Sequence, residues 1–68
     1  MPKRTTAPLP ALQRLRVKSA LTQQELADAA GIHRVTVAEI EGGRGANMAT
    51  IRALANALKC QPGDLTEG

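Results

Sequence analysis

The side chains that could carry out chemistry are few in this 68-residue chain, and their spacing argues against catalysis. Cys60 is the only cysteine and His33 the only histidine, which excludes an internal disulfide and a cysteine–histidine metal cluster. The glycine-rich segment 42–45 follows a predicted helix rather than a strand, so it lacks the context of a phosphate-cradling loop. We therefore predict that the chain is not an enzyme and holds no metal and no cofactor. Cys60 is expected to be a small buried apolar side chain in a reducing cytoplasm.

The basic side chains are concentrated at the start of the chain. Residues 1–20 carry five basic side chains and no acidic one, whereas residues 21–68 carry four basic and six acidic ones. A basic first third on a nearly neutral body favours binding to a polyanion, although a solvated tail and helix face is the alternative. The absence of Phe, Tyr and Trp removes the residues that stack on unpaired bases. Double-stranded DNA is therefore the preferred polyanion.

A capping box marks the beginning of one helix in the middle of the chain. Thr22 and Glu25 are three residues apart, which allows each side chain to bind the main-chain N–H of the other. The apolar spacing that follows predicts a helix over about 23–30. Gly31 is expected to end this helix because glycine adopts positive φ without penalty.

A second helix is predicted directly after this turn, over about 33–41. Val37 and Ile40 lie at helical spacing and form its inner face. Two helices joined by so short a turn must cross steeply and touch, and the small side chain of Ala27 allows the contact. The alternative is an ordinary helical hairpin, but the capping box and the basic flank favour a DNA-binding helix-turn-helix.

The rest of the chain predicts further helices and no strand. Residues 1–8 are expected to form a flexible basic arm, with residues 9–68 as one domain. Asn47 is a suitable N-cap for a helix whose apolar stripe begins at Met48. The predicted fold class is all-α, a compact bundle of five helices. The three helices outside the central pair are expected over about 10–19, 48–59 and 62–65.

The central segment strongly resembles the helix-turn-helix of the phage repressor and Cro family, also called the XRE family. The resemblance extends over about residues 9–66 and includes Arg16, Glu41 and the segment TIRALANAL. It implies a five-helix DNA-binding domain in which the second helix crosses the DNA backbone and the third presents its first turns to base edges. The residues that carry the central resemblance are Gln23, Ala27, Gly31, Val37 and Ile40.

The resemblance also implies which residues face the bases: His33, Arg34, Val35, Thr36 and Glu39. The Arg34 guanidinium can donate two hydrogen bonds to guanine, worth roughly 1–3 kcal/mol of discrimination. Val35 suits a thymine methyl group or a half-buried helix position, and Thr36 suits a base or a phosphate. Glu39 can accept from cytosine N4 or hold Arg34, although helix neighbours sit three or four residues apart. His33 departs from the family, which usually has Ser or Thr there.

Phosphate contacts implied by the resemblance come from the ends of several predicted helices. We expect Arg16 to pair with Glu41 and also to approach the DNA backbone; the alternative is a surface salt bridge worth under about 1 kcal/mol. Gln23 begins a helix, where free N–H groups can also meet a phosphate. The predicted phosphate-contacting residues are Thr22, Gln23, Arg16, Arg44 and Asn47.

The predicted function is that of a transcriptional repressor or autoregulator that binds a palindromic DNA operator as a homodimer, one weak without DNA. The predicted dimer surface comprises Leu58, Pro62 and Leu65. Alternatives are the antitoxin of a toxin–antitoxin pair, a restriction-modification controller, or a protein–protein adaptor on the same fold. No apolar run is long enough for a membrane span, so we expect a cytoplasmic protein associated with a bacterial or phage nucleoid.

Overall fold

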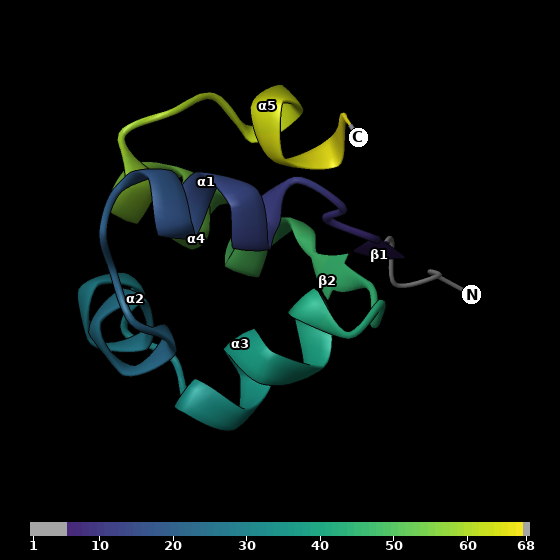
Figure 1. Cartoon of the computed structure of the whole chain (residues 1–68). Helices are drawn as coiled ribbons and strands as arrows, with labels where there is room; N and C mark the ends of the chain where they lie inside the picture. The colour runs from purple at the N-terminus through teal and green to yellow at the C-terminus, as the bar shows by residue number, and fades with distance from the viewer. Residues whose placement is uncertain (1–5, 68) are drawn as a thin grey trace.

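The computed structural model of the protein describes residues 6–67 and consists of five short helices with one small strand pair. Helix α4 lies in the middle and contacts α2 and α5, while α3 lies at one end of the domain and α5 at the other (Figure 1). In chain order the elements are β1 (Thr6–Ala7), α1 (Leu12–Lys18), α2 (Gln23–Ala30), α3 (Arg34–Glu41), β2 (Ala46–Asn47), α4 (Met48–Leu58) and α5 (Pro62–Thr66).

The helix-turn-helix forms as its capping residues predict. Thr22 Oγ1 accepts from the Glu25 N–H at 3.0 Å, and Glu25 Oε1 accepts from the Thr22 N–H at 2.9 Å. Gly31 ends α2 with a φ of 71°, and the Ile32 N–H donates to the Ala27 carbonyl at 2.9 Å. These bonds satisfy main-chain groups that the helix ends would otherwise leave without a partner. The turn thereby fixes the direction in which α3 leaves α2.

The core is built from one apolar face of every helix. Ala27 is fully buried where α2 contacts α3, and Val37 and Ile40 turn inward from α3 as predicted. Most of the predicted stripe of α4 is also buried, but Met48 is 41% exposed because it begins the helix at the surface beside β2. The buried side chains that form the cluster are Leu9, Leu12, Leu26, Ala27, Val37, Ile40, Ala46, Ile51, Leu54, Ala55 and Leu65.

The prediction that Leu65 contributes to a dimer surface is wrong. Its side chain is fully buried, because α5 closes the bundle and inserts Leu65 between α1 and α4. Asp64 Oδ2 accepts from the Gln61 N–H at 3.0 Å, and the Ala11 N–H donates to the Leu65 carbonyl at 3.3 Å. These bonds hold α5 in place, so Leu65 stabilises the fold.

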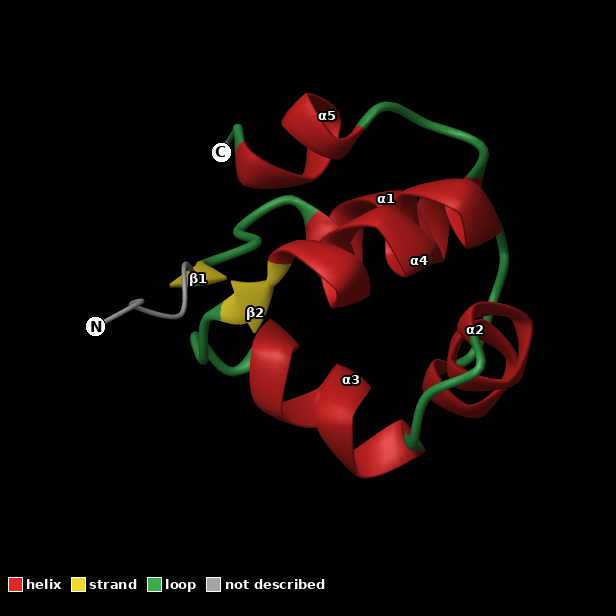
Figure 2. Ribbon diagram, turned by 180° about the vertical axis from the view of Figure 1, so that it is seen from behind, coloured by secondary structure: helices red, strands yellow, loops and turns green. Residues whose placement is uncertain are grey.

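The prediction of no strand is also wrong. It follows that residues 6 and 7, which are predicted to lie in the flexible arm, belong to the folded domain. Residues 6 and 7 pair antiparallel with Ala46 and Asn47 (Figure 2). A Cβ at Gly45 would lie 3.1 Å from Thr6 Oγ1, so the absence of a side chain there allows the close approach. Two-residue strands are too short for the alternation by which strands are recognised in a sequence. The remainder of the predicted arm, residues 1–5, lies outside the described residues.

The φ of Gly31 gives a first prediction. Gly31→Val should lower the free energy of unfolding by about 2 kcal/mol, because a β-branched residue is strained in the left-handed region. No heavy atom lies within 4 Å of a Cβ built at Gly31, so the cost arises from the backbone alone. Thermal denaturation followed by far-UV circular dichroism measures the effect, with Gly31→Asn as control because asparagine tolerates this conformation. Equal melting of the two variants would contradict the assignment.

Candidate nucleic-acid interface

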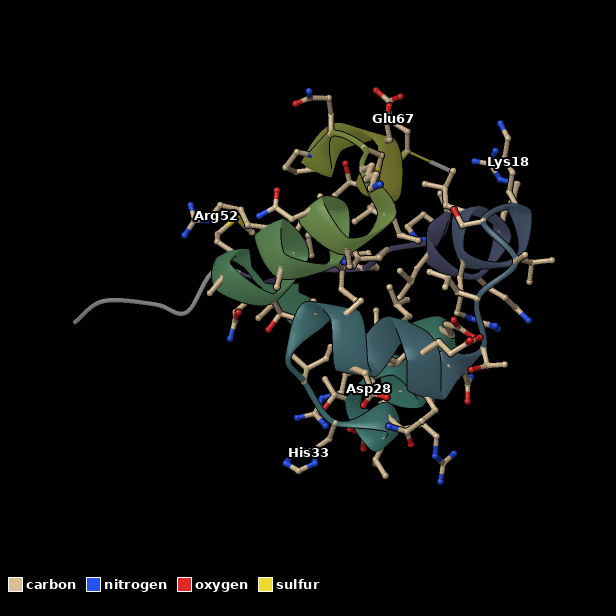
Figure 3. All side chains as sticks on the ribbon, turned by 90° about the vertical axis from the view of Figure 1, so that its left-hand side faces the viewer. Lys18, Asp28, His33, Arg52 and Glu67 are labelled. Atoms are coloured by element: carbon tan, nitrogen blue, oxygen red, sulfur yellow. The ribbon has the colours of Figure 1, made fainter. Side chains whose placement is uncertain are left out.

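Helix α3 presents its outer side to solvent at one end of the domain. Val37 and Ile40 hold its inner side against the core, which turns Val35 and, one turn later, Glu39 outward. Val35 is 58% exposed, and Arg34 is exposed in the first turn. This exposure of Val35 rules out the alternative that it is a half-buried helix residue. In Figure 3 the labelled His33 lies at the end of the domain opposite to Lys18 and Glu67.

The start of α3 has no side-chain cap. His33 occupies the N-cap position with extended φ and ψ angles of −78° and 145°, but its imidazole accepts no hydrogen bond from the helix. Histidine is a poorer cap than Ser or Thr, the residues that the family usually has at this position. The His33 side chain is exposed and therefore accessible to DNA, as are those of Arg34 and Val35. Thr36 is half-buried beside them.

A partly buried ion pair ties three helices together behind this surface. Arg16 on α1 donates from Nε to Glu41 Oε2 at 2.6 Å and from Nη2 to Glu41 Oε1 at 3.1 Å. Gln23 on α2 donates to the same Oε1 at 3.0 Å, and Arg16 Nη1 donates to the Leu21 carbonyl at 2.8 Å. The Arg16 and Glu41 side chains are only 11% and 6% exposed. The predicted pair is therefore confirmed, and because both side chains are only slightly exposed, the alternative of a solvent-exposed surface salt bridge is excluded.

Two predicted phosphate contacts, Arg16 and Gln23, are thus engaged with Glu41. Their hydrogen bonds fix the start of α2 relative to the end of α3, which sets the geometry of the helix-turn-helix. The contact of either side chain with a phosphate stays a prediction. Sequence reasoning anticipated the Arg16–Glu41 pair through the family resemblance, but it missed Gln23 as the third member of the cluster.

The environment of Glu41 lowers the pKa of its carboxyl group. Burial alone would raise that pKa, but the hydrogen bonds from Arg16 and Gln23 and the charge of Arg16 together outweigh the burial. The same hydrogen bond raises the pKa of the Arg16 guanidinium, against the opposing effect of burial. Both groups are therefore charged at neutral pH.

The lowered pKa of Glu41 predicts a loss of stability in acid. A carboxyl whose pKa is lower in the folded state stabilises the fold above its ordinary value of 4.5. This contribution begins to be lost as the pH falls below that ordinary value, and it is gone once the pH has fallen through the lower pKa of the folded state. Urea denaturation of the wild type and Glu41→Gln at each pH measures it. Parallel pH curves for the two proteins would contradict the prediction.

A second ion pair, which sequence reasoning missed, lies on the exposed side of α3. Arg44 Nη1 donates to Glu39 Oε1 at 2.8 Å, and the side chains of Arg44 and Glu39 are 68% and 44% exposed. The pair is possible because the chain turns back after α3, so two residues five apart meet. Glu39 thus binds Arg44 rather than Arg34, the partner that we considered from the sequence.

A shallow hollow of about 150 Å³ separates the end of α3 from the start of α4. Asn47 lies on its edge and caps α4, with Oδ1 accepting from the Thr50 N–H at 2.8 Å. The N-cap role of Asn47 is therefore confirmed, and its contact with a phosphate stays a prediction. The residues that line the hollow are Thr36, Glu39, Ile40, Arg44, Gly45, Ala46, Asn47 and Thr50.

Cys60 lies away from this surface and is half-buried against the core. Burial raises the pKa of its thiol, and the charge of Asp64 raises it further. A raised pKa keeps the thiol protonated and unreactive, which is consistent with an apolar structural role. Within residues 6–67, no group of three or more potential metal ligands comes together. None of the described helices is long and apolar enough to cross a membrane.

Comparisons with known proteins agree with this geometry. A family model described as helix-turn-helix matches residues 12–65. Among solved structures, the chain is similar to the restriction-modification controller protein C.AhdI from Aeromonas hydrophila, with 35% sequence identity and a TM-score of 0.77. That match covers 82% of this chain and 86% of the controller protein. A comparison with curated proteins found no match.

Proposed function

The chain belongs to the helix-turn-helix family, as its resemblance to phage repressor and Cro proteins predicted, and on this basis we propose that it is a sequence-specific transcriptional regulator that binds double-stranded DNA. One observation carries the proposal. The outer side of α3 exposes Arg34 and Val35, while the buried Arg16–Glu41 pair fixes α3 against the helices behind it. A rigidly held helix that exposes both a polar and an apolar side chain on its outer side suits insertion into the major groove.

The side chains of α3 differ in the base chemistry that they offer. The Arg34 guanidinium suits two hydrogen bonds to guanine O6 and N7, and the exposed Val35 suits contact with a thymine methyl group. His33 and Thr36 lie on either side of them and can bind a base or a phosphate. Thr22, Gln23 and Asn47 lie at the starts of α2 and α4, where free N–H groups favour phosphate oxygens.

Two copies of the chain would be needed to read an operator of useful length. One helix reads only a few base pairs, and a two-fold dimer places two such helices about one DNA turn apart. After the correction for Leu65, the proposed dimer surface comprises the half-buried Leu58 and the exposed Pro62. This apolar surface is small, so we expect a weak dimer that forms fully on DNA. A toxin partner has no support from any observation.

Control of a restriction-modification operon is the setting best supported. The similarity to a restriction-modification controller protein spans most of both chains at 35% identity. A regulator of this kind would occupy a promoter near its own gene and set the level of transcription. The adaptor alternative is less well supported, because the exposed Arg34 on α3 favours a polyanion over a protein surface.

Transcription from a reporter promoter tests the proposed function. The DNA upstream of the chain's own gene is placed before a reporter, and transcripts are measured in vitro at increasing concentrations of the protein. We expect transcript levels to change at concentrations that leave an unrelated promoter unaffected. Identical responses of the two promoters, or no response of either, would contradict a role in regulating that promoter.

A further inference from the structure

The ion pair between Glu39 and Arg44 lies on the side of α3 that we assign to DNA. Both side chains are exposed, and an ion pair of this kind contributes under about 1 kcal/mol to stability. The buried Arg16–Glu41 pair already fixes α3 in the bundle. The fold therefore gains little from the Glu39–Arg44 contact, and its location favours a role in DNA binding.

Main-chain hydrogen bonds also keep Arg44 close to Glu39. The Arg44 N–H donates to the Glu39 carbonyl at 3.0 Å, and the Gly43 N–H donates to the Ile40 carbonyl at 3.0 Å. Gly43 makes this turn with a φ of 112°, a conformation that favours glycine. Because these two bonds anchor the loop to the end of α3, Arg44 is positioned for Glu39 before any ligand binds.

A carboxylate in a DNA-binding surface is repelled by the phosphates unless its charge is balanced. Arg44 supplies that balance by donating to Glu39 Oε1. Among the described residues, no hydrogen-bond donor binds the second oxygen, Oε2. Both side chains border the hollow beside α3, so this free oxygen is accessible from outside. The pair therefore presents Glu39 Oε2 as a hydrogen-bond acceptor toward a bound duplex, while Arg44 balances the negative charge of the carboxylate.

We propose that Glu39 and Arg44 form one unit that selects cytosine, with Glu39 Oε2 accepting from the N4 amino group and Arg44 acting as a positioning residue. This inference rests on the proposed DNA-binding function. In the major groove, guanine and thymine present acceptors that repel a carboxylate, and adenine places its N7 acceptor next to its amino group. Cytosine presents its N4 donor next to the C5–H of the same ring, so an acceptor, O6 of the paired guanine, lies on one side of the donor only, whereas the adenine amino group has acceptors on both sides.

The location of Glu39 also predicts where the selected cytosine lies. Val35 and Glu39 are four residues apart on the outward side of α3, which separates them by about 6 Å along the helix axis. With α3 lying along the major groove, the selected cytosine should therefore lie within about two base pairs of the base that Val35 contacts. Arg34 reads a different base, so changes at Glu39 and Arg34 should alter different positions of the operator.

Selection from a randomised duplex library tests this assignment. The wild type should enrich sites with cytosine at one position of each half-site, bound roughly tenfold more tightly than the same site with another base there. Glu39→Gln should shift that position toward adenine, because glutamine binds adenine N6 and N7 together. Arg44→Gln should weaken the cytosine preference, whereas Arg34→Ala, the matched control, should change another position.

The same experiment separates failure of this inference from failure of the proposed function. A wild type that enriches no sequence would overturn both. An enriched site whose base preferences are the same for wild type, Glu39→Gln and Glu39→Ala would overturn the inference alone. If Arg44→Gln keeps the cytosine preference in the selection, the positioning role of Arg44 is wrong; a salt slope lower by about one phosphate, measured by titrating the selected site over a salt series, would then make Arg44 a phosphate contact. All variants should melt as the wild type does, because the pair is exposed.

Discussion

Arg16→Ala is expected to lower the free energy of unfolding by about 3 kcal/mol, because it leaves the Glu41 carboxylate buried without its charged partner. The Glu41 side chain is only 6% exposed, so without Arg16 its charge keeps the hydrogen bond from Gln23 but has no opposite charge beside it in a poorly solvated position. In a domain of this size such a loss lowers the melting temperature by roughly 12–24 °C. Thermal denaturation followed by far-UV circular dichroism measures the change.

The exposed Glu39–Arg44 pair provides the matched control for this prediction. Arg44→Ala removes the same type of side chain from a pair of similar length, yet it should change stability by under about 1 kcal/mol. The double variant Arg16→Met/Glu41→Met should recover much of the loss, since it removes both buried charges. Equal effects of Arg16→Ala and Arg44→Ala would refute the structural role of the buried pair.

Arg34→Ala is expected to reduce binding to the preferred operator by roughly 5- to 150-fold, which corresponds to the 1–3 kcal/mol of a two-bond contact with guanine. Binding to scrambled DNA should fall far less, because a base contact contributes only where the right base is present. Fluorescence anisotropy of labelled duplexes measures both affinities. The variant should fold normally, because Arg34 is exposed and lies outside the core.

Lys18→Ala controls for the loss of one positive charge. Lys18 lies at the opposite end of the domain from the labelled His33 (Figure 3), so its removal should change both affinities little. If Arg34→Ala weakens operator and scrambled DNA by the same factor, Arg34 contacts a phosphate and reads no base. The base-reading role would then have to come from other side chains of α3.

Local patterns in the sequence predicted the helix-turn-helix correctly. The capping box of Thr22 and Glu25 and the positive φ of Gly31 depend on residues only a few positions apart, so their types suffice to predict them. The inward placement of Val37 and Ile40 follows from helical spacing for the same reason. The Arg16–Glu41 pair joins distant segments, and only the family resemblance predicted it.

The features that sequence reasoning missed depend on how distant or irregular segments pack. Leu65 belongs to a helix of five residues, too short for an apolar pattern to show which side is buried. The β1–β2 pair forms because Thr6 packs closely against the main chain at Gly45, where no side chain is in the way. Glu39 contacts Arg44 because the loop turns back at Gly43. Helical spacing does not predict this contact, since side chains on a helix meet at three or four residues and not at five.

Binding of the purified chain to its own upstream DNA, in competition with scrambled DNA and over a series of salt concentrations, tests the central claim most directly. We predict tight binding to the upstream duplex that scrambled competitor does not displace, with a salt dependence that reports the number of phosphate contacts. Equal, weak and salt-sensitive binding to both duplexes would contradict the claim that α3 reads a base sequence.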